Sequence, residues 1–290
     1  MTEDNVDSKE HENNQEKHQK DLERKSGEVE ESKRYSEILS SVINEGEQIF
    51  KIKSRAMFLS ACIAGLEIGF SYTLICTLYF LMDGKVSDPV IFKSFALVYP
   101  LGFILVILGK SALFTEQTSV LALPVLNRQR TIFELLKVWL VVILGNILGG
   151  VIFVLSIGNL AAHLEVFDQA TMIKLGLHVF DHSYGILLLS GIFAGWLMGL
   201  LTWLLNSTMD VLTRILIITI ITGTIGFVGF HHSIVGNIEV FGAFLYSEAI
   251  SLGDYFIFLL LTLLGNGIGG AIVVGLFKYR IFASNYPSND

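Results

Sequence analysis

The chain has 290 residues, of which 52% are hydrophobic and only 16% are charged, a balance outside the range of soluble globular domains. About half of the 20 basic and 27 acidic residues lie in the first 55 positions, so the net charge of −7 describes a tail and loops. This charge is no argument for a nucleic-acid partner. We expect an all-α integral membrane protein rather than a soluble enzyme.

The N-terminal part of the chain differs from the rest. Residues 1–33 are rich in Glu, Lys, Asn and Gln and have almost no large apolar side chains, which predicts a disordered, charged tail. Residues 34–55 carry apolar residues at helical spacing with acids opposite. This pattern predicts an amphipathic helix at the membrane surface or against the membrane domain, although a packed helix of a small tail fits it nearly as well. Residues 56–282 are predicted to form the membrane domain and 283–290 a short second tail.

Six hydrophobic segments follow, each near or above the roughly 20 residues that cross a bilayer. They are Ala56–Met82, Phe92–Leu126, Ile132–Ile157, Tyr184–Leu205, Leu212–Tyr246 and Tyr255–Phe277. The second and fifth are too long for one span, and each contains a polar stretch, at residues 110–118 and 229–237. Irregular backbone at membrane depth is tolerated only where protein covers it or it lines a cavity. Two broken spans in corresponding positions therefore indicate the functional centre.

The basic residues at the span ends predict the orientation in the membrane. One side carries Lys51, Lys53, Arg55, Arg128, Arg130, Arg214, Lys278 and Arg280, and the other only Lys85, Lys93 and Lys174. We therefore expect both termini to be cytoplasmic.

The two halves of the membrane domain resemble each other. Residues 60–65 (SACIAG) match 190–195 (SGIFAG), and residues 144–150 (LGNILGG) match 264–270 (LGNGIGG). Glycine-rich apolar helices match by chance, but two matches in the same order around two breaks make chance a poor explanation. Each half holds three spans, so the second copy enters the membrane inverted. Such a 3+3 repeat with two broken helices builds a site at the bilayer midplane.

Several polar residues in and around the breaks are candidates for supporting them. Asn146 and Asn266 are expected to cap free backbone groups of the breaks. Lys110, Glu116 and Glu239 are ionisable residues at membrane depth, where a functional role is the default hypothesis. We interpret them instead as structural, with Lys110 paired to a glutamate.

Four strings carry a resemblance to the formate/nitrite transporter family and, within it, to a divergent branch. They are Leu113-Phe114-Thr115, Trp139–Asn146, His232-Ser233-Ile234 and Gly265-Asn266, within a match that covers about residues 35–282. The resemblance implies an aquaporin-like channel for small monovalent anions in the bacterial cytoplasmic (inner) membrane. It also implies a homopentamer with one pore per protomer, embedded in the lipid bilayer, and no enzymatic activity.

The resemblance further implies a pore centre where His232 faces Thr115. It places apolar constrictions above and below, at Tyr99, Phe103, Leu113, Met198 and Ile225. Two family asparagines are replaced here, by Gly195 in span four and by Gly236 in the second break. A vestibule lysine of the family has no counterpart before span four, where the chain reads His178-Val179-Phe180-Asp181-His182.

Formate is the leading substrate expectation, and nitrite, hydrosulfide and lactate are rivals of the same class. An aquaporin-type neutral-solute pore is a second class, but the paired Asn-Pro-Ala motifs of such pores are missing from the sequence. A membrane haem or metal enzyme is a third class. Only His178 and His182 have helical i, i+4 spacing, which is a weak metal site, so no cofactor is expected. A fourth possibility is a member of the family that has lost conduction.

Overall fold

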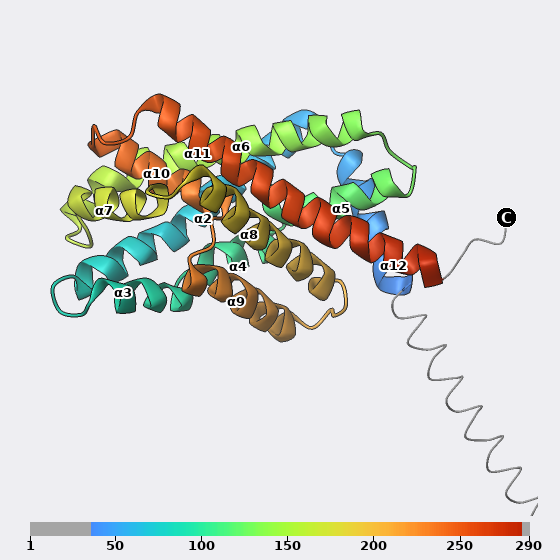
Figure 1. Ribbon diagram of the computed structural model, residues 1–290, viewed down its shortest axis with the longest axis horizontal. Helices are drawn as coiled ribbons and strands as arrows, with labels where there is room; N and C mark the ends of the chain where they lie inside the picture. Colours follow the sequence, from blue (N-terminus) through green and yellow to red (C-terminus); the bar gives the residue numbers. More distant parts are fainter. Residues whose placement is uncertain (1–35, 286–290) are drawn as a thin grey trace, which may run out of the picture. The chain divides into compact units, whose positions relative to one another are not determined.

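The computed structural model describes residues 36–285, and over this range every regular element is helical (Figure 1). The predicted tail 1–33 lies outside the described residues, as do residues 286–290 of the second predicted tail. The chain divides into two compact units after Ser41. Of the first unit, the described residues are only the opening of a helix that runs over 36–50. The elements discussed below lie in the second unit.

The elements after this helix are named as in Figure 1. They are α2 (Ser54–Met82), α3 (Asp88–Ser94), η1 (Phe95–Leu97), α4 (Pro100–Gly109), α5 (Phe114–Leu126), α6 (Ile132–His163), α7 (Gln169–Phe180), α8 (Tyr184–Leu205), α9 (Val211–Val228), α10 (Ser233–Tyr246), α11 (Leu252–Gly267), η2 (Ile268–Leu276) and α12 (Phe277–Asn285). Within the described residues, 6 helical segments are long and apolar enough to cross a membrane. The prediction of six spans is confirmed.

The structure refines the predicted spans. The fourth has the predicted bounds, and the second and fifth are each divided into two helices, α4 with α5 and α9 with α10. Two short helices, α3 and α7, were not anticipated, because segments of 7 and 12 residues are too short to give a spanning signal. The sixth span also differs, since α11 passes into the π-helix η2 and then α12 as one long run (Figure 1).

The packing of the helices repeats between the two halves. Helix α2 packs along α6, and α8 packs along α11 in the same way. The second half-helix of each broken span contacts the opposite repeat: α5 packs against α8 and η2, and α10 packs against α2 and α6. This is the 3+3 inverted repeat expected of an aquaporin-like fold, with the two half-helices crossing between the repeats.

The two breaks share one backbone geometry. Helix α4 ends before Lys110, which adopts the left-handed conformation with φ 63°, and α5 begins at Phe114. Helix α9 ends before Gly229, also left-handed with φ 85°, and α10 begins at Ser233. The left-handed residue stops the first half-helix and turns the chain. Glycine adopts this conformation without strain, whereas a lysine does so at a cost of roughly 1–2 kcal/mol.

Helix α6 carries a long apolar stripe that no other described element covers. Its exposed members recur every three or four residues: Leu136, Leu140, Leu144, Leu148, Ile152 and Leu155. In water such a stripe would be unfavourable, but it suits a helix that faces lipid or another membrane protein. The stripe agrees with a membrane-embedded fold.

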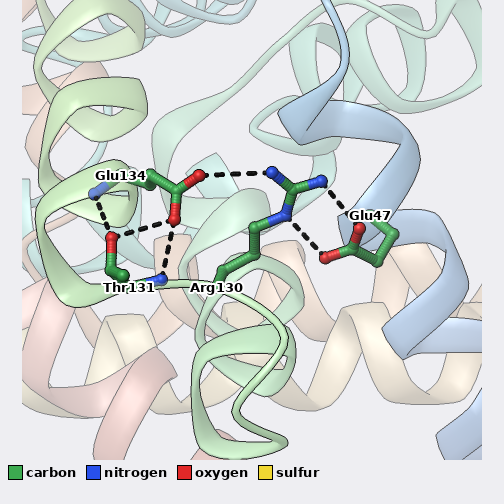
Figure 2. A network of polar contacts seen from close by, with 4 residues as sticks. All are labelled: Glu47, Arg130, Thr131 and Glu134. Atoms are coloured by element: carbon green, nitrogen blue, oxygen red, sulfur yellow. Dashed lines mark hydrogen bonds and ion pairs between the residues drawn. The ribbon is translucent and has the colours of Figure 1, made fainter.

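The N-terminal helix is anchored to the membrane domain from Val42 onward. Gly46 lies so close to α5 that a Cβ there would collide with the Val120 carbonyl and the ring of Pro124. The Arg130 guanidinium lies between two carboxylates (Figure 2): its Nε and Nη2 donate to Glu47 over 2.9 and 2.8 Å, and its Nη1 donates to Glu134 over 3.2 Å. Part of the predicted amphipathic helix thus packs on protein.

This ion pair predicts a pH effect on the N-terminal helix. The hydrogen bonds from Arg130 hold the pKa of Glu47 below its ordinary value. A depressed pKa in the folded state contributes stability above the unfolded pKa, and this contribution is lost as the pH falls through the folded pKa. Lowering the pH through this range should therefore weaken the packing of residues 42–50 by about 1 kcal/mol.

Hydrogen exchange of the amides of residues 42–50, measured at pH 6 and pH 3, would check this effect. In Glu47→Gln the protection should be lower at pH 6 and should lose most of its pH dependence. The exposed Glu248→Gln is the control and should behave like the unaltered protein. Equal protection in the Glu47→Gln variant at pH 6 would contradict the role of this ion pair.

Candidate functional site

The first break is bridged by the side chain of Asn146 from α6. Its amide Nδ2 donates to the carbonyls of Ala61 and Ala112, both over 2.8 Å. Its Oδ1 accepts from the backbone N–H of Phe114, the first residue of α5, over 2.9 Å. Both N–H groups of the amide and its oxygen are thus directed at the backbone, and Asn146 is fully buried.

The second break is bridged in the same way by Asn266 from α11. Its Nδ2 donates to the carbonyls of Gly191 and His231 over 2.8 and 3.0 Å. Its Oδ1 accepts from the N–H of Ser233, the first residue of α10, over 2.8 Å. The two asparagines therefore occupy equivalent positions in the two repeats. Backbone groups freed by a broken membrane helix need such partners.

Two serines complete the bridging, and sequence reasoning did not assign them this role. Ser60 accepts from the N–H of Ala112 over 3.0 Å, and Ser190 accepts from the N–H of His231 over 3.0 Å. Both serines open the matched strings of the repeat, SACIAG and SGIFAG. The match itself was the signal that could have identified them, because a polar residue kept at one place in both copies of an apolar helix requires a polar partner.

His232 and Thr115 meet between the two half-helices. The His232 Nε2 lies 2.7 Å from the Thr115 Oγ1, and the exposed fractions of these residues are 2% and 0%. His232 is the N-cap of α10, where its Nδ1 accepts from the N–H of Val235 over 3.4 Å. This bond leaves the ring proton on Nε2, which donates to the threonine hydroxyl. Thr115 is the second residue of α5, so the positive ends of two helix dipoles meet here.

Apolar side chains surround this contact. The Phe103 ring stands edge-on to the His232 ring, with 4.9 Å between the ring centroids. The Tyr99 ring stacks on the Phe103 ring, with 5.4 Å between their centroids. Leu113, Met198 and Ile225 are fully buried. Of the five side chains expected at constrictions, Tyr99 and Ile225 line a cavity that reaches His232.

Two cavities approach the His232–Thr115 contact. We call the larger one, of about 440 Å³, the histidine vestibule. It is lined by residues that include Tyr99, His178, His182, His231, His232 and Glu239. We call the smaller one, of about 150 Å³, the lysine vestibule, and it is lined by residues that include Glu45, Lys110, Ser111, Ala112, Glu116 and Gln117. His232 borders one cavity and the neighbours of Thr115 border the other, so their contact lies between the two.

Over the range that the structure describes, the ionisable residues near the breaks do not form the ion pair that we expected between Lys110 and a glutamate. Among residues 36–285 no ion pair joins Lys110 to a glutamate, because this lysine is exposed at the turn and its left-handed backbone forms the end of α4. The carboxyls of Glu116 and Glu239 likewise have no hydrogen bond or ion pair with another described residue. Each lines one vestibule instead: Glu116 the lysine vestibule and Glu239 the histidine vestibule.

Gly195 and Gly236, which the resemblance placed where the family has asparagines, lie in different surroundings. A Cβ at Gly195 would collide with the backbone of Asn266, as a Cβ at Gly65 would collide with the Asn146 carbonyl. Gly195 therefore allows α8 to approach α11, and it does not line either vestibule. Gly236 does line the histidine vestibule, where a Cβ would meet the Phe258 ring at 2.8 Å.

The remaining histidines of the vestibule have structural partners. The ring of His231 is fixed at both nitrogens, with Nδ1 2.8 Å from Ser190 Oγ and Nε2 3.0 Å from the Val179 carbonyl. The ring of His178 stacks on the ring of Phe92, with 3.8 Å between the ring centroids. Burial, with help from nearby His182, lowers the pKa of His178 below its ordinary value. Within the described part of the chain, no three His, Cys, Asp or Glu residues are grouped so that they could hold a metal ion.

An inverted repeat of six spans, with two half-helices meeting at a buried polar pair, defines a membrane channel of the aquaporin-like class. The chain belongs to the formate/nitrite transporter family, whose sequence profile matches residues 36–280. The members of this family are transport proteins, not enzymes.

Individual relatives agree with this assignment. The chain is 28% identical over 241 residues to the inner membrane protein YfdC of Escherichia coli, covering 81% of this chain and 74% of YfdC. It is 24% identical over 191 residues to the formate channel BtFdhC of Bacillus thuringiensis, covering 66% and 73%. A solved pentameric formate channel with formate bound has the same fold, with a TM-score of 0.67, 22% identity, and coverage of 79% of this chain and 97% of that one.

Proposed function

We propose that the protein is a homopentameric channel that moves small monovalent weak-acid anions, formate first, across the bacterial cytoplasmic membrane. The observation that carries the proposal is the 2.7 Å contact between His232 Nε2 and Thr115 Oγ1 at the meeting point of two vestibules. Both termini face the cytoplasm in this proposal, because the basic residues gather at that side.

The central difficulty for such a channel is the cost of taking an anion out of water. An unpaired carboxylate in an apolar constriction costs many kcal/mol unless it is neutralised or fully coordinated. Phe103, Leu113 and Met198 provide such surroundings here. A weak acid has a neutral form that avoids most of this cost, whereas a permanent anion such as chloride has none. We therefore infer selectivity for weak acids.

The His232–Thr115 pair supplies hydrogen-bond donors that the apolar constriction lacks. The Nε2–H of His232 donates to Thr115, and that hydroxyl has its own proton to offer to an oxygen of the passing anion. The positive ends of α5 and α10 add attraction for negative charge at the same place. In this mechanism His232 assists protonation of the anion as it passes between the vestibules.

The pentamer and formate as the first substrate are supported by similarity. A pentameric formate channel has the same fold, and BtFdhC is a formate channel with related sequence. The other substrates to be compared are nitrite, hydrosulfide and lactate.

A flux panel tests the proposed function. Purified protein in liposomes should pass formate well above protein-free vesicles and should pass water no faster than those vesicles. Native mass spectrometry of the same preparation should show five copies. Rapid water flux without flux of any weak acid would overturn the proposal in favour of a neutral-solute pore.

A further inference from the structure

Glu239 is a carboxylic acid in the wall of the proposed pore. It belongs to α10, is only 8% exposed, and lines the histidine vestibule together with His232. His232, Gly236 and Glu239 are spaced four and three residues apart, which places them on one face of the half-helix, and all three line this same cavity. The polar side chains of His232 and Glu239 thus lie on one face of α10, in the wall of the same vestibule.

The carboxyl has no basic partner in the described part of the chain. Lys93 donates to the Phe227 carbonyl over 2.7 Å, and Lys174 pairs with Asp83 and Asp88. The titratable and charged groups of the elements packed around Glu239 are Tyr72 and Cys76 of α2, Asp88 and Lys93 of α3, Tyr99 before α4, Lys174 and His178 of α7, and His182, His231 and His232 of the connecting segments. No ion pair or hydrogen bond links any of them to the Glu239 carboxyl.

A permanent negative charge here would work against the function proposed above. An unpaired carboxylate in the vestibule wall costs free energy and also repels an approaching anion. The protonated carboxylic acid removes both costs and offers an O–H to the anion. Ionisable residues at membrane depth commonly mark proton pathways.

We propose that Glu239 is a second proton-exchanging group of the pore, which meets the weak acid in the histidine vestibule before it reaches His232. An entering carboxylate anion takes the Oε proton of protonated Glu239 and becomes the neutral acid, while Glu239 becomes a carboxylate. A hydronium ion that arrives from the bulk solution through the water of the vestibule then protonates Glu239 again and is left as water. For a substrate that leaves through this vestibule the same steps run in reverse. This inference rests on the proposed function.

The test compares Glu239→Gln, Glu239→Asp and Glu67→Gln with the unaltered protein in liposomes. Glutamine keeps the shape of the side chain but cannot exchange a proton, and aspartate keeps the acid. Glu67 lies on α2 and lines neither vestibule, so it is the matched control. Formate uptake and the accompanying proton uptake are measured from pH 5 to pH 8, and native mass spectrometry checks assembly.

In Glu239→Gln we expect formate uptake at neutral pH to fall by about 10²-fold, the low end of what a positioned proton donor contributes. Its pH profile should flatten, whereas Glu239→Asp and Glu67→Gln should keep the profile of the unaltered protein. If Glu239→Gln does not assemble, the Glu239→Asp variant provides the test. An assembled Glu239→Asp channel whose formate uptake does not depend on pH would overturn the proposal. An unchanged profile in Glu239→Gln, even with faster uptake, would overturn it too. Absence of weak-acid uptake in the unaltered protein would instead reject the proposed function.

Discussion

Replacement of Asn266 by leucine is expected to prevent the formation of a stable channel. The substitution keeps a similar volume but removes hydrogen bonds to the Ser233 N–H and to the carbonyls of Gly191 and His231. These backbone groups are buried at membrane depth, so no bulk water replaces the lost partner. Each costs about 1–3 kcal/mol when left unsatisfied. The total approaches the 5–15 kcal/mol that typically holds a folded domain together.

Thermal melting in detergent, followed by size-exclusion chromatography, measures this effect. Asn146→Leu should be equally damaging, because Asn146 makes the equivalent bonds at the first break. Asn159→Leu is the matched control, since Asn159 lies on the exposed side of α6. An Asn266→Leu protein with an unchanged Tm would mean that the second break is held by other contacts.

The second large effect is expected from His232→Asn. Asparagine still has a donor and an acceptor but is smaller, so the fold and the assembly should be preserved. It cannot exchange a proton in the relevant pH range. Formate flux at neutral pH should therefore fall by about 10²-fold and lose its pH dependence. The measurement is stopped-flow uptake in liposomes between pH 5 and pH 8.

The adjacent histidine provides the control for this substitution. Both ring nitrogens of His231 are occupied by Ser190 and the Val179 carbonyl, so His231→Asn should lower the Tm while leaving the pH profile of transport in place. Thr115→Val, which removes the hydroxyl but keeps the shape, should resemble His232→Asn more weakly. If His232→Asn abolished folding while the other two variants transported normally, His232 would be a buried structural group.

Much of the fold was predictable because membranes impose simple rules. Span length, the repeated strings and the polar breaks together predicted six spans and two broken helices. Helix α7 was missed because a segment of 12 residues is too short to give a spanning signal. The π-helical turn η2 was missed as well, because π-helical hydrogen bonding leaves no periodic pattern that differs clearly from an α-helix.

The site was predictable only in part. His232 and Thr115 were inferred from resemblance, and the structure brings them into contact. The expected partner of Lys110 was inferred from charge alone, which does not say where a side chain points. The surroundings of Glu239 depend on helices that are distant in sequence, so the vestibule was visible only after folding.

Formate uptake under an imposed membrane potential tests the central claim most directly. Liposomes containing the unaltered protein are given a formate gradient at zero and at inside-negative potential, with a pH-sensitive dye in the lumen. If the anion crosses together with a proton, the initial uptake should be equal at both potentials and the lumen should acidify in step with it. Uptake that the inside-negative potential suppresses, without acidification, would show a bare anion crossing and would contradict the mechanism.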